Sequence, residues 1–116
     1  MTESQFQAKL LRALRAHPAM KDAVIVKLND RFTRGLPDVM ISLRGKTTFF
    51  ELKKWPESPT KIQAYFLERM APCSWVLTFD RGMATFMYSG AKGNQFILRN
   101  NDFHETLRAV IVRCAQ

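Results

Sequence analysis

Arg34-Gly35-Leu36-Pro37-Asp38-Val39-Met40-Ile41-Ser42-Leu43, followed closely by Thr48-Phe49-Phe50-Glu51-Leu52-Lys53-Lys54, is the stretch that decides the fold. Two apolar runs, 39–43 and 47–52, flank Arg44-Gly45-Lys46, and this pattern predicts a β-hairpin with glycine in its turn. The runs are rich in Val, Ile, Thr and Phe, which suit a pleated and half-buried surface. We therefore expect two adjacent antiparallel strands here.

The alternation of side chains along a strand sorts the second run into two faces. Glu51 and Lys53 share one face, while Phe50 and Leu52 share the other. Asp38 enters the preceding strand, so in an antiparallel hairpin its carboxylate comes alongside Glu51. The pattern predicts two carboxylates and one ammonium at a single place.

Such a cluster is costly without a function. Two like charges about 4 Å apart repel by roughly 4 kcal/mol at an effective dielectric constant of 20. A divalent cation removes that repulsion, and ligands that are all oxygen suit Mg²⁺ or Mn²⁺. Lys53 is then placed to orient or deprotonate a water molecule, or to hold a phosphate oxygen. These groups are typical of sites that hydrolyse phosphodiesters.

The order of these motifs resembles a known nuclease signature. Gly35-Leu36-Pro37-Asp38, a hairpin and then Glu51-Leu52-Lys53 is similar to the PD-(D/E)XK pattern. Ser58-Pro59 followed by Gln63-Ala64-Tyr65 resembles the VRR-NUC branch of that superfamily, with one more residue between Pro59 and Gln63 than the branch has. The resemblance covers about residues 1–80, and it depends on three linked motifs in the right order.

The resemblance implies an endonuclease that depends on Mg²⁺ or Mn²⁺. Asp38, Glu51 and the backbone carbonyl of Leu52 would bind the metal. Lys53 would position the attacking water, and Gln63 would support it. Small members of this branch resemble structure-selective nucleases, including homodimeric Holliday-junction resolvases often encoded by phages. The resemblance therefore also implies branched DNA as the substrate and a homodimer as the active form.

Glu3 has two interpretations. Phe6, Leu10 and Leu14 recur at four-residue spacing, which predicts a helix over residues 3–16 with Glu3 on its inward stripe. Glu3 then either complements the helix dipole, worth about 0.3–1 kcal/mol, or points into the active site and helps to hold the metal, as in many nucleases that the chain resembles. The sequence leaves both open.

The composition indicates one domain, residues 1–116, with an ordinary globular core, since 47% of the residues are hydrophobic. No apolar run approaches the ~20 residues of a membrane-spanning helix, and the N-terminus is polar. We therefore expect a soluble intracellular protein without membrane contact, in the host cytoplasm if a phage encodes it. Cys73 and Cys114 are predicted to be reduced core thiols.

The charge balance favours a nucleic acid as partner. The 18 Lys and Arg residues exceed the 10 Asp and Glu residues, giving a net charge of +8, and such a balance attracts polyanions. Solubility alone is the alternative explanation. The residues predicted to contact DNA phosphates are those near the motif, Arg31, Arg34, Lys54 and Lys61, because guanidinium and ammonium groups bind phosphate oxygens. They can equally be surface charges.

The remaining elements are predicted from periodicity and caps. Ser58 is the expected N-cap of a helix ending at Met70, with Pro59 at its first position and Gln63 on its apolar face. Asp102 and Glu105 are expected to cap a last helix. Further strands are predicted at 23–28, 74–79, 83–88 and 95–98. The resulting fold class is α/β: helix, three-stranded meander, helix, strand, then a small β addition and a C-terminal helix.

Two other functions remain open. The chain is alternatively a catalytically inactive module that binds nucleic acid, or a small basic subunit of a replication or repair complex. If it is a homodimer, its apolar contact surface is expected outside the nuclease core. The candidates are the segment 86–88 and the last helix around Val110 and Ile111. Packing of these residues on the sheet is the competing explanation.

Overall fold

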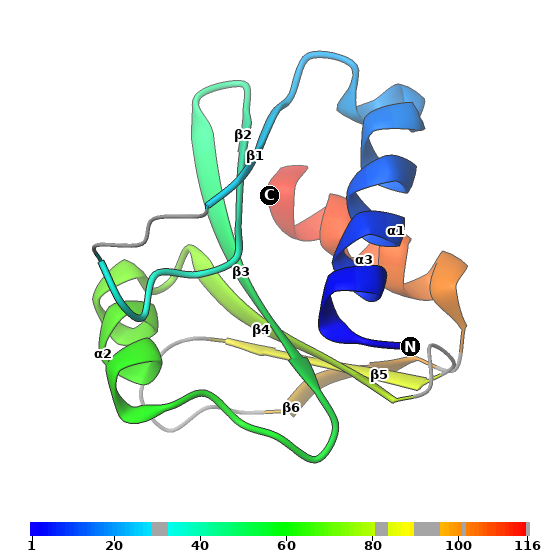
Figure 1. Ribbon diagram of the computed structural model, residues 1–116. Helices are drawn as coiled ribbons and strands as arrows, with labels where there is room; N and C mark the ends of the chain where they lie inside the picture. The colour runs from blue at the N-terminus through cyan, green and yellow to red at the C-terminus, as the bar shows by residue number, and fades with distance from the viewer. Residues whose placement is uncertain (29–32, 81–83, 90–95, 101, 116) are drawn as a thin grey trace.

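A single six-stranded sheet forms the centre of the molecule, with α1 and α3 on one face and α2 on the other (Figure 1). The structure is a computed structural model that describes residues 1–28, 33–80, 84–89, 96–100 and 102–115. Its elements in chain order are α1 (Glu3–Ala16), the 3₁₀ helix η1 (Pro18–Met20), β1 (Val24–Lys27), β2 (Val39–Leu43), β3 (Lys46–Lys54), α2 (Lys61–Met70), β4 (Ser74–Asp80), β5 (Ala84–Ser89), β6 (Phe96–Asn100) and α3 (Phe103–Ala115).

The order of elements confirms the predicted α/β architecture. Strands β1, β2 and β3 form the antiparallel meander, and α2 connects β3 to β4, which run parallel. Strands β5 and β6 extend the same sheet beyond β4, so the predicted β addition is a continuation of the sheet. The hairpin turn holds Arg44 at φ 51° and Gly45 at φ 83°, the backbone of a type I′ turn.

The alternation predicted for β3 divides its side chains between the two layers. Phe50 and Leu52 are buried against the α1 and α3 layer, where the rings of Phe6 and Phe79 pack with their centroids 4.4 Å apart. Such aromatic pairs add about 0.5–1.5 kcal/mol to the burial of their area. The alternate side chains of β3, among them Glu51 and Lys53, point to the opposite face of the sheet, which α2 covers.

The predicted helix over residues 3–16 and the predicted cap at Asp102 are confirmed, and Thr2 is the N-cap of the first helix. Thr2 Oγ1 accepts from Gln5 N at 3.1 Å and Gln5 Oε1 accepts from Thr2 N at 2.8 Å, a reciprocal capping box. Asp102 Oδ1 accepts from Glu105 N at 2.8 Å. Each contact satisfies amide donors that have no partner inside the first turn of a helix.

The predicted start of α2 at Ser58 is wrong, because the N-cap is Thr60. Thr60 Oγ1 accepts from Gln63 N at 3.3 Å, and Gln63 Oε1 accepts from Thr60 N at 2.9 Å. With Ser58 as the cap, the third helical position would be Lys61, which carries no acceptor to return the hydrogen bond. The Thr60–Gln63 pair satisfies two amides at once, and the helix begins two residues later than predicted.

The surfaces predicted for dimer contact are also wrong in part. Met87 and Val110 are both 0% exposed and belong to the hydrophobic core, and Ile111 packs against that core. Their apolar character therefore serves the packing of β5 and α3. Cys114 is buried and Cys73 is partly buried, and both are free thiols as predicted. No helix in the described part of the chain has the length and apolar character needed to cross a bilayer.

Gly35 is the point where the segment leading to Asp38 meets α2. Its φ is +88°, and a Cβ at this position would lie 2.9 Å from the backbone carbon and oxygen of Ile62. No side chain larger than hydrogen fits there without moving the first turn of α2. The glycine of the motif thus sets the distance between the Asp38 strand and the helix that covers the site.

We expect Gly35→Ala to destabilise the protein more than Gly45→Ala. Both alanines meet the cost of a left-handed backbone, about 1–2 kcal/mol, but at Gly45 a Cβ has no atom within 4 Å. Gly45→Ala is therefore the matched control, and the difference between the two unfolding free energies in urea measures the clash with Ile62. Equal destabilisation by the two variants would show that the contact with α2 tolerates a methyl group.

Candidate active site

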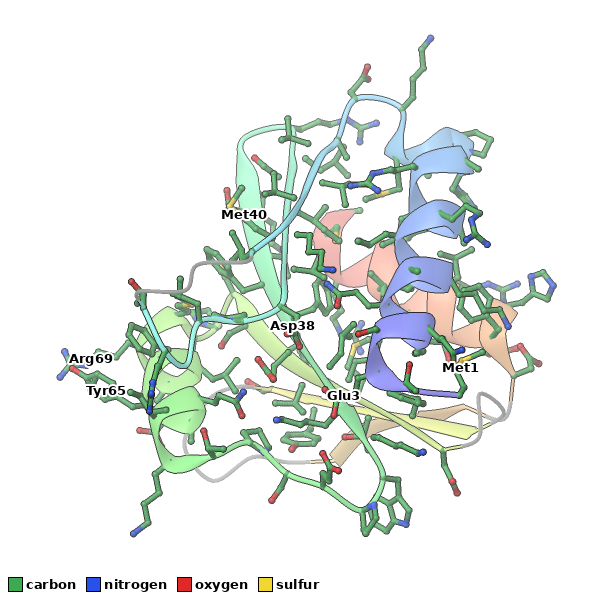
Figure 2. The ribbon with its side chains drawn as sticks, viewed as in Figure 1. Met1, Glu3, Asp38, Met40, Tyr65 and Arg69 are labelled. Atoms are coloured by element: carbon green, nitrogen blue, oxygen red, sulfur yellow. The ribbon has the colours of Figure 1, made fainter. Side chains whose placement is uncertain are left out.

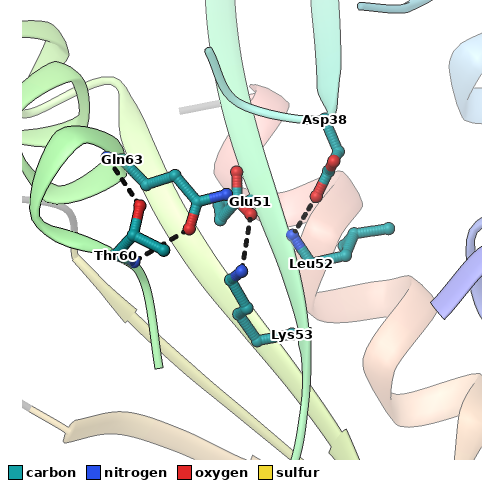
Figure 3. A network of polar contacts seen from close by, with 6 residues as sticks. All are labelled: Asp38, Glu51, Leu52, Lys53, Thr60 and Gln63. Carbon is teal, nitrogen blue, oxygen red and sulfur yellow. Dashed lines mark hydrogen bonds and ion pairs between the residues drawn. The ribbon is translucent and has the colours of Figure 1, made fainter. Parts of the chain in front are cut away.

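Asp38 is anchored to the backbone of the neighbouring strand. Leu52 N donates to Asp38 Oδ2 at 2.7 Å (Figure 3). The register that pairs Val39 with Phe50 brings Pro37 opposite Leu52, past the end of β2. The Asp38 carboxylate thus satisfies an amide there. Because the N–H and C=O groups of one strand residue point to the same side, the Leu52 carbonyl also faces Asp38.

Glu51 is a buried carboxylate that is incompletely paired. Its side chain lies next to Asp38 in the same register and is 1% exposed as a residue. Oε2 lies 3.6 Å from Lys53 Nζ, while Oε1 is buried without a hydrogen-bond partner among the described residues. Burial, followed by the charge of Asp38, raises the pKa of Glu51 to about 8. Its negative form is therefore incompletely compensated by its surroundings.

Burial also raises the pKa values of the other two acidic groups of the site, Asp38 and Glu3. Burial is the largest cause that raises the pKa of Asp38, and the hydrogen bond from Leu52 opposes it. Burial also raises the pKa of Glu3 most, with the charge of Lys53 opposing it and the nearby Glu57 and Asp38 adding to it. Figure 2 shows Glu3 at the start of α1 beside Asp38. Several acidic groups thus act on one another in this place.

The carboxylates are not drawn into one tight group. Within the described ranges, His, Cys, Asp and Glu side chains form no group of three that could hold a metal ion. Two carboxylates and the Leu52 carbonyl are the oxygens that the geometry brings together. Glu3 contributes to the negative field of the site, and its role as a metal ligand stays a prediction.

Lys53 is the cation inside this cluster. It is 9% exposed, and burial of a charged group is costly unless it is paired. Its ammonium group is paired with Glu51 Oε2 and lies near enough to Glu3 and Asp38 to favour their charged forms. The predicted association of Glu51 and Lys53 on one face of the strand is confirmed. Such an ammonium can hold an anionic oxygen or a water molecule.

Gln63 lies beside the cluster but has a structural contact of its own. Figure 3 shows its side chain next to Glu51, with the amide oxygen turned to Thr60. That oxygen is occupied by the capping box, so the amide nitrogen is the end of the side chain left for the site. The prediction that Gln63 supports Lys53 or a water molecule stays a prediction, restricted to a donor role.

The structure adds Tyr88 and Lys27 to the site. Glu51 pairs with Val76, and Val76 pairs with Tyr88, so one row of the sheet leads from the carboxylate to the phenol. Burial first, and then the charge of Glu51, raise the pKa of Tyr88. Lys27 of β1 favours the charged form of Asp38. The sequence gives no signal for Tyr88, because the row depends on strand pairing between distant segments.

The structure describes three of the four residues predicted to contact DNA. Arg34, Lys54 and Lys61 are exposed, at the start of the Asp38 segment, at the end of β3 and at the start of α2. Arg31 lies outside the described residues. These exposed cations thus lie on the segments that carry or adjoin the site residues, where solvent and a phosphate group can reach them.

A comparison with known proteins finds similarity in fold. No family model matches the chain, and no curated protein matches it. Among solved structures, Hjc of the hyperthermophilic archaeon Archaeoglobus fulgidus, described as a Holliday junction resolvase, is similar in fold with a TM-score of 0.50. The two sequences are 11% identical over 89% of this chain and 92% of that chain. The likeness covers nearly all of both chains, and it confirms the predicted restriction-endonuclease-like α/β fold.

Proposed function

We propose that the protein is a metal-dependent endonuclease that hydrolyses phosphodiester bonds in DNA and prefers branched substrates. The observation that carries the proposal is the pairing of Asp38, fixed by the Leu52 amide, with buried Glu51, whose Oε1 has no partner among the described residues, beside Lys53. The resemblance to the PD-(D/E)XK motifs assigns these same three residues to catalysis. The fold shared with Hjc supports the proposal.

The donor set fits Mg²⁺ or Mn²⁺. Asp38, Glu51 and the Leu52 carbonyl would hold the ion, because all three offer oxygen, the ligand that these cations prefer. A divalent ion would offset the two largest causes that raise the pKa of Glu51, its burial and the charge of Asp38. When bound, the ion would supply Lewis acidity to a phosphoryl oxygen.

The residues of the chain would then share the remaining work. Lys53 would hold or deprotonate the attacking water, or stabilise a phosphate oxygen as charge develops on it. The amide nitrogen of Gln63 would donate to that water or to Glu51. Glu3 would add a further acidic group at the start of α1. Arg34, Lys54 and Lys61, with Arg31, would bind phosphates on either side of the cleaved bond.

A homodimer is the proposed active form for branched DNA. One chain carries one cluster, which can cut one strand at a time. A four-way junction has near two-fold symmetry, and a C₂ dimer supplies two clusters in the matching arrangement. The inactive DNA-binding module and the basic subunit of a larger complex explain the charge of the chain, but neither requires a buried carboxylate with an unpaired oxygen.

We expect Asp38→Asn to lower cleavage by about 10²–10³-fold, the loss typical when one group that stabilises the transition state is removed. Asparagine retains an acceptor for the Leu52 amide, so the fold should persist. Linear, flapped and four-way DNAs, with and without Mn²⁺, form the substrate panel. Asp22→Asn, at an exposed position away from the cluster, is the control. Undiminished turnover by Asp38→Asn would remove the assignment.

Lys53→Ala should bind Mn²⁺ and lose most of the cleavage rate, and Lys53→Arg should not restore it. A guanidinium group stays protonated and differs in shape from an ammonium group, so it cannot deprotonate water in the same way. Calorimetry measures the metal and single-turnover kinetics measures the rate. Lys54→Ala, at the exposed neighbouring position, should instead weaken DNA binding. Full activity in Lys53→Arg would show that Lys53 acts only as a positive charge that contacts phosphate.

Glu51→Gln should stabilise the metal-free protein at alkaline pH. The pKa of Glu51 is about 8 in the folded chain and ordinarily 4.5, so the folded state holds the proton more tightly. Its contribution to stability is present below pH 4.5 and is lost as the pH rises through 8.

At pH 8 the melting temperature of Glu51→Gln should exceed that of the parent by roughly 4 °C or more, the shift that about 1 kcal/mol produces. Glu68→Gln, at an exposed position of α2, is the control and should leave the melting temperature at pH 8 unchanged. Mn²⁺ should raise the melting temperature of the parent and not that of Glu51→Gln. A parent stability that stays flat from pH 5 to 8 would contradict the unpaired state of Glu51.

The protein should sediment as a dimer at micromolar concentration and cut a four-way junction by paired nicks at symmetric positions. Linear duplex of the same length should be cut more slowly. Sedimentation velocity and mapping of the nicks on each arm test the two statements separately. If the protein is a monomer that cuts linear and branched DNA at equal rates, the nuclease assignment stands and the proposed preference for junctions is wrong.

A further inference from the structure

A groove of about 610 Å³ separates α1 from β1. Its size is within the range of sites that bind ligands. It is lined by one face of α1, distinct from the face that packs Phe6, Leu10 and Leu14 into the core, and by Lys27 of the sheet-edge strand β1. Of the residues placed at the carboxylate cluster above, Lys27 is the one that lines it. The groove therefore adjoins the cluster but does not contain its carboxylates.

The charge of the groove has one sign. Arg12, Arg15 and Lys27 line it and are exposed, and none of its lining residues is Asp or Glu. Arg15 Nη2 also donates to the Ile25 carbonyl at 3.3 Å, which holds its guanidinium group over the free edge of β1. Gln7, which is 9% exposed, adds a polar side chain to the lining. These are the group types that contact phosphates and sugars in nucleic acids.

The groove leads toward the carboxylate cluster. At one end Ser4 follows Glu3 directly in α1. On the other wall Lys27 is near enough to Asp38 for its charge to oppose part of the rise that burial causes in the pKa of that carboxyl. From Ser4 to Ala16 the helix rises about 18 Å at 1.5 Å per residue. That length matches about five nucleotides of one strand in a duplex, at 3.4 Å each. A strand lying in the groove would thus arrive at Asp38 and Glu3.

We infer that the α1–β1 groove binds the sugar-phosphate backbone of one DNA strand next to the cleaved bond, with Arg12, Arg15 and Lys27 as its phosphate contacts. The inference rests on the proposed function only in taking the ligand to be the DNA that the site would cut. Because the contacts are to phosphates, binding in the groove would be independent of base sequence. An acidic protein segment is the competing ligand for the same charges.

The test compares two triple variants that each remove three positive charges. The groove variant is Arg12→Gln, Arg15→Gln and Lys27→Gln. The control variant is Arg44→Gln, Arg69→Gln and Arg108→Gln, at exposed positions outside the groove. Fluorescence anisotropy with a labelled duplex and a labelled four-way junction measures Kd between 50 and 200 mM salt, without divalent metal so that the DNA stays intact.

Three lost phosphate contacts should lower the slope of log K against log salt by about 2.7. Over this salt range the parent protein should then lose about 40-fold more affinity than the groove variant. The control variant should keep nearly the parent slope. Equal losses in the two variants would mean that net charge alone attracts DNA, and an unchanged slope in the groove variant would mean that DNA lies elsewhere. Either result overturns the groove assignment.

A second variant guards against a folding defect. Arg12→Gln with Lys27→Gln keeps the hydrogen bond from Arg15 to Ile25, and thermal melting of each variant checks the fold. This double variant should show about two-thirds of the slope change expected for the triple variant. Cleavage by the parent protein in Mn²⁺ is scored separately. If the parent protein cleaves DNA but the groove variant keeps the parent's salt slope, the groove assignment is wrong and the nuclease assignment stands. If the groove variant loses the expected slope but the parent protein does not cleave DNA, the nuclease assignment is wrong and the groove assignment stands.

Discussion

The hydrogen bond from the Leu52 amide to the Asp38 carboxylate serves both the fold and the site, because it satisfies a backbone amide and fixes the position of a site carboxylate. Pro37 lies just before β2 (Val39–Leu43), and at this end of the strand pair the acceptor for the Leu52 amide of β3 is the Asp38 side chain. A buried amide without a partner costs about 1–3 kcal/mol. Asp38 satisfies that amide and, through the same bond, is held next to Glu51. The position of the carboxylate is therefore set by backbone pairing.

A second constraint follows from the burial of Glu51 beside Asp38. The net charge of the chain is +8, with only 10 acidic residues, yet Glu3, Asp38, Glu51 and Glu57 act on one another in one place. Lys53 alone compensates Glu51 by an ion pair in the described cluster. Such an arrangement destabilises the chain in the absence of a cation, as strained groups at functional sites commonly do. The exposed positive charges would meanwhile attract a polyanion such as DNA to the region.

Local patterns in the sequence predicted most of the fold and the centre of the site. Period-two alternation places Glu51 and Lys53 on one face, a property of one strand, and the helix over 3–16 follows from its own stripe and cap. The start of α2 was missed because two capping residues compete two positions apart. The burial of Met87 and Val110 and the approach of Tyr88 to Glu51 depend on β4, β5 and α3 packing together. No local period encodes those distances.

The geometry also bears on why the chain would select DNA by shape. The cations that lie near the cluster and line the groove would contact phosphates, which carry no direct information on base sequence. α1, which lines the groove, and α2, near the other exposed cations, lie on opposite faces of the sheet. In the proposed complex one backbone would occupy the groove, and a second backbone that leaves a branch point at an angle would contact the cations near α2. Selectivity for structure would then arise from where the positive charges lie around Asp38 and Glu51.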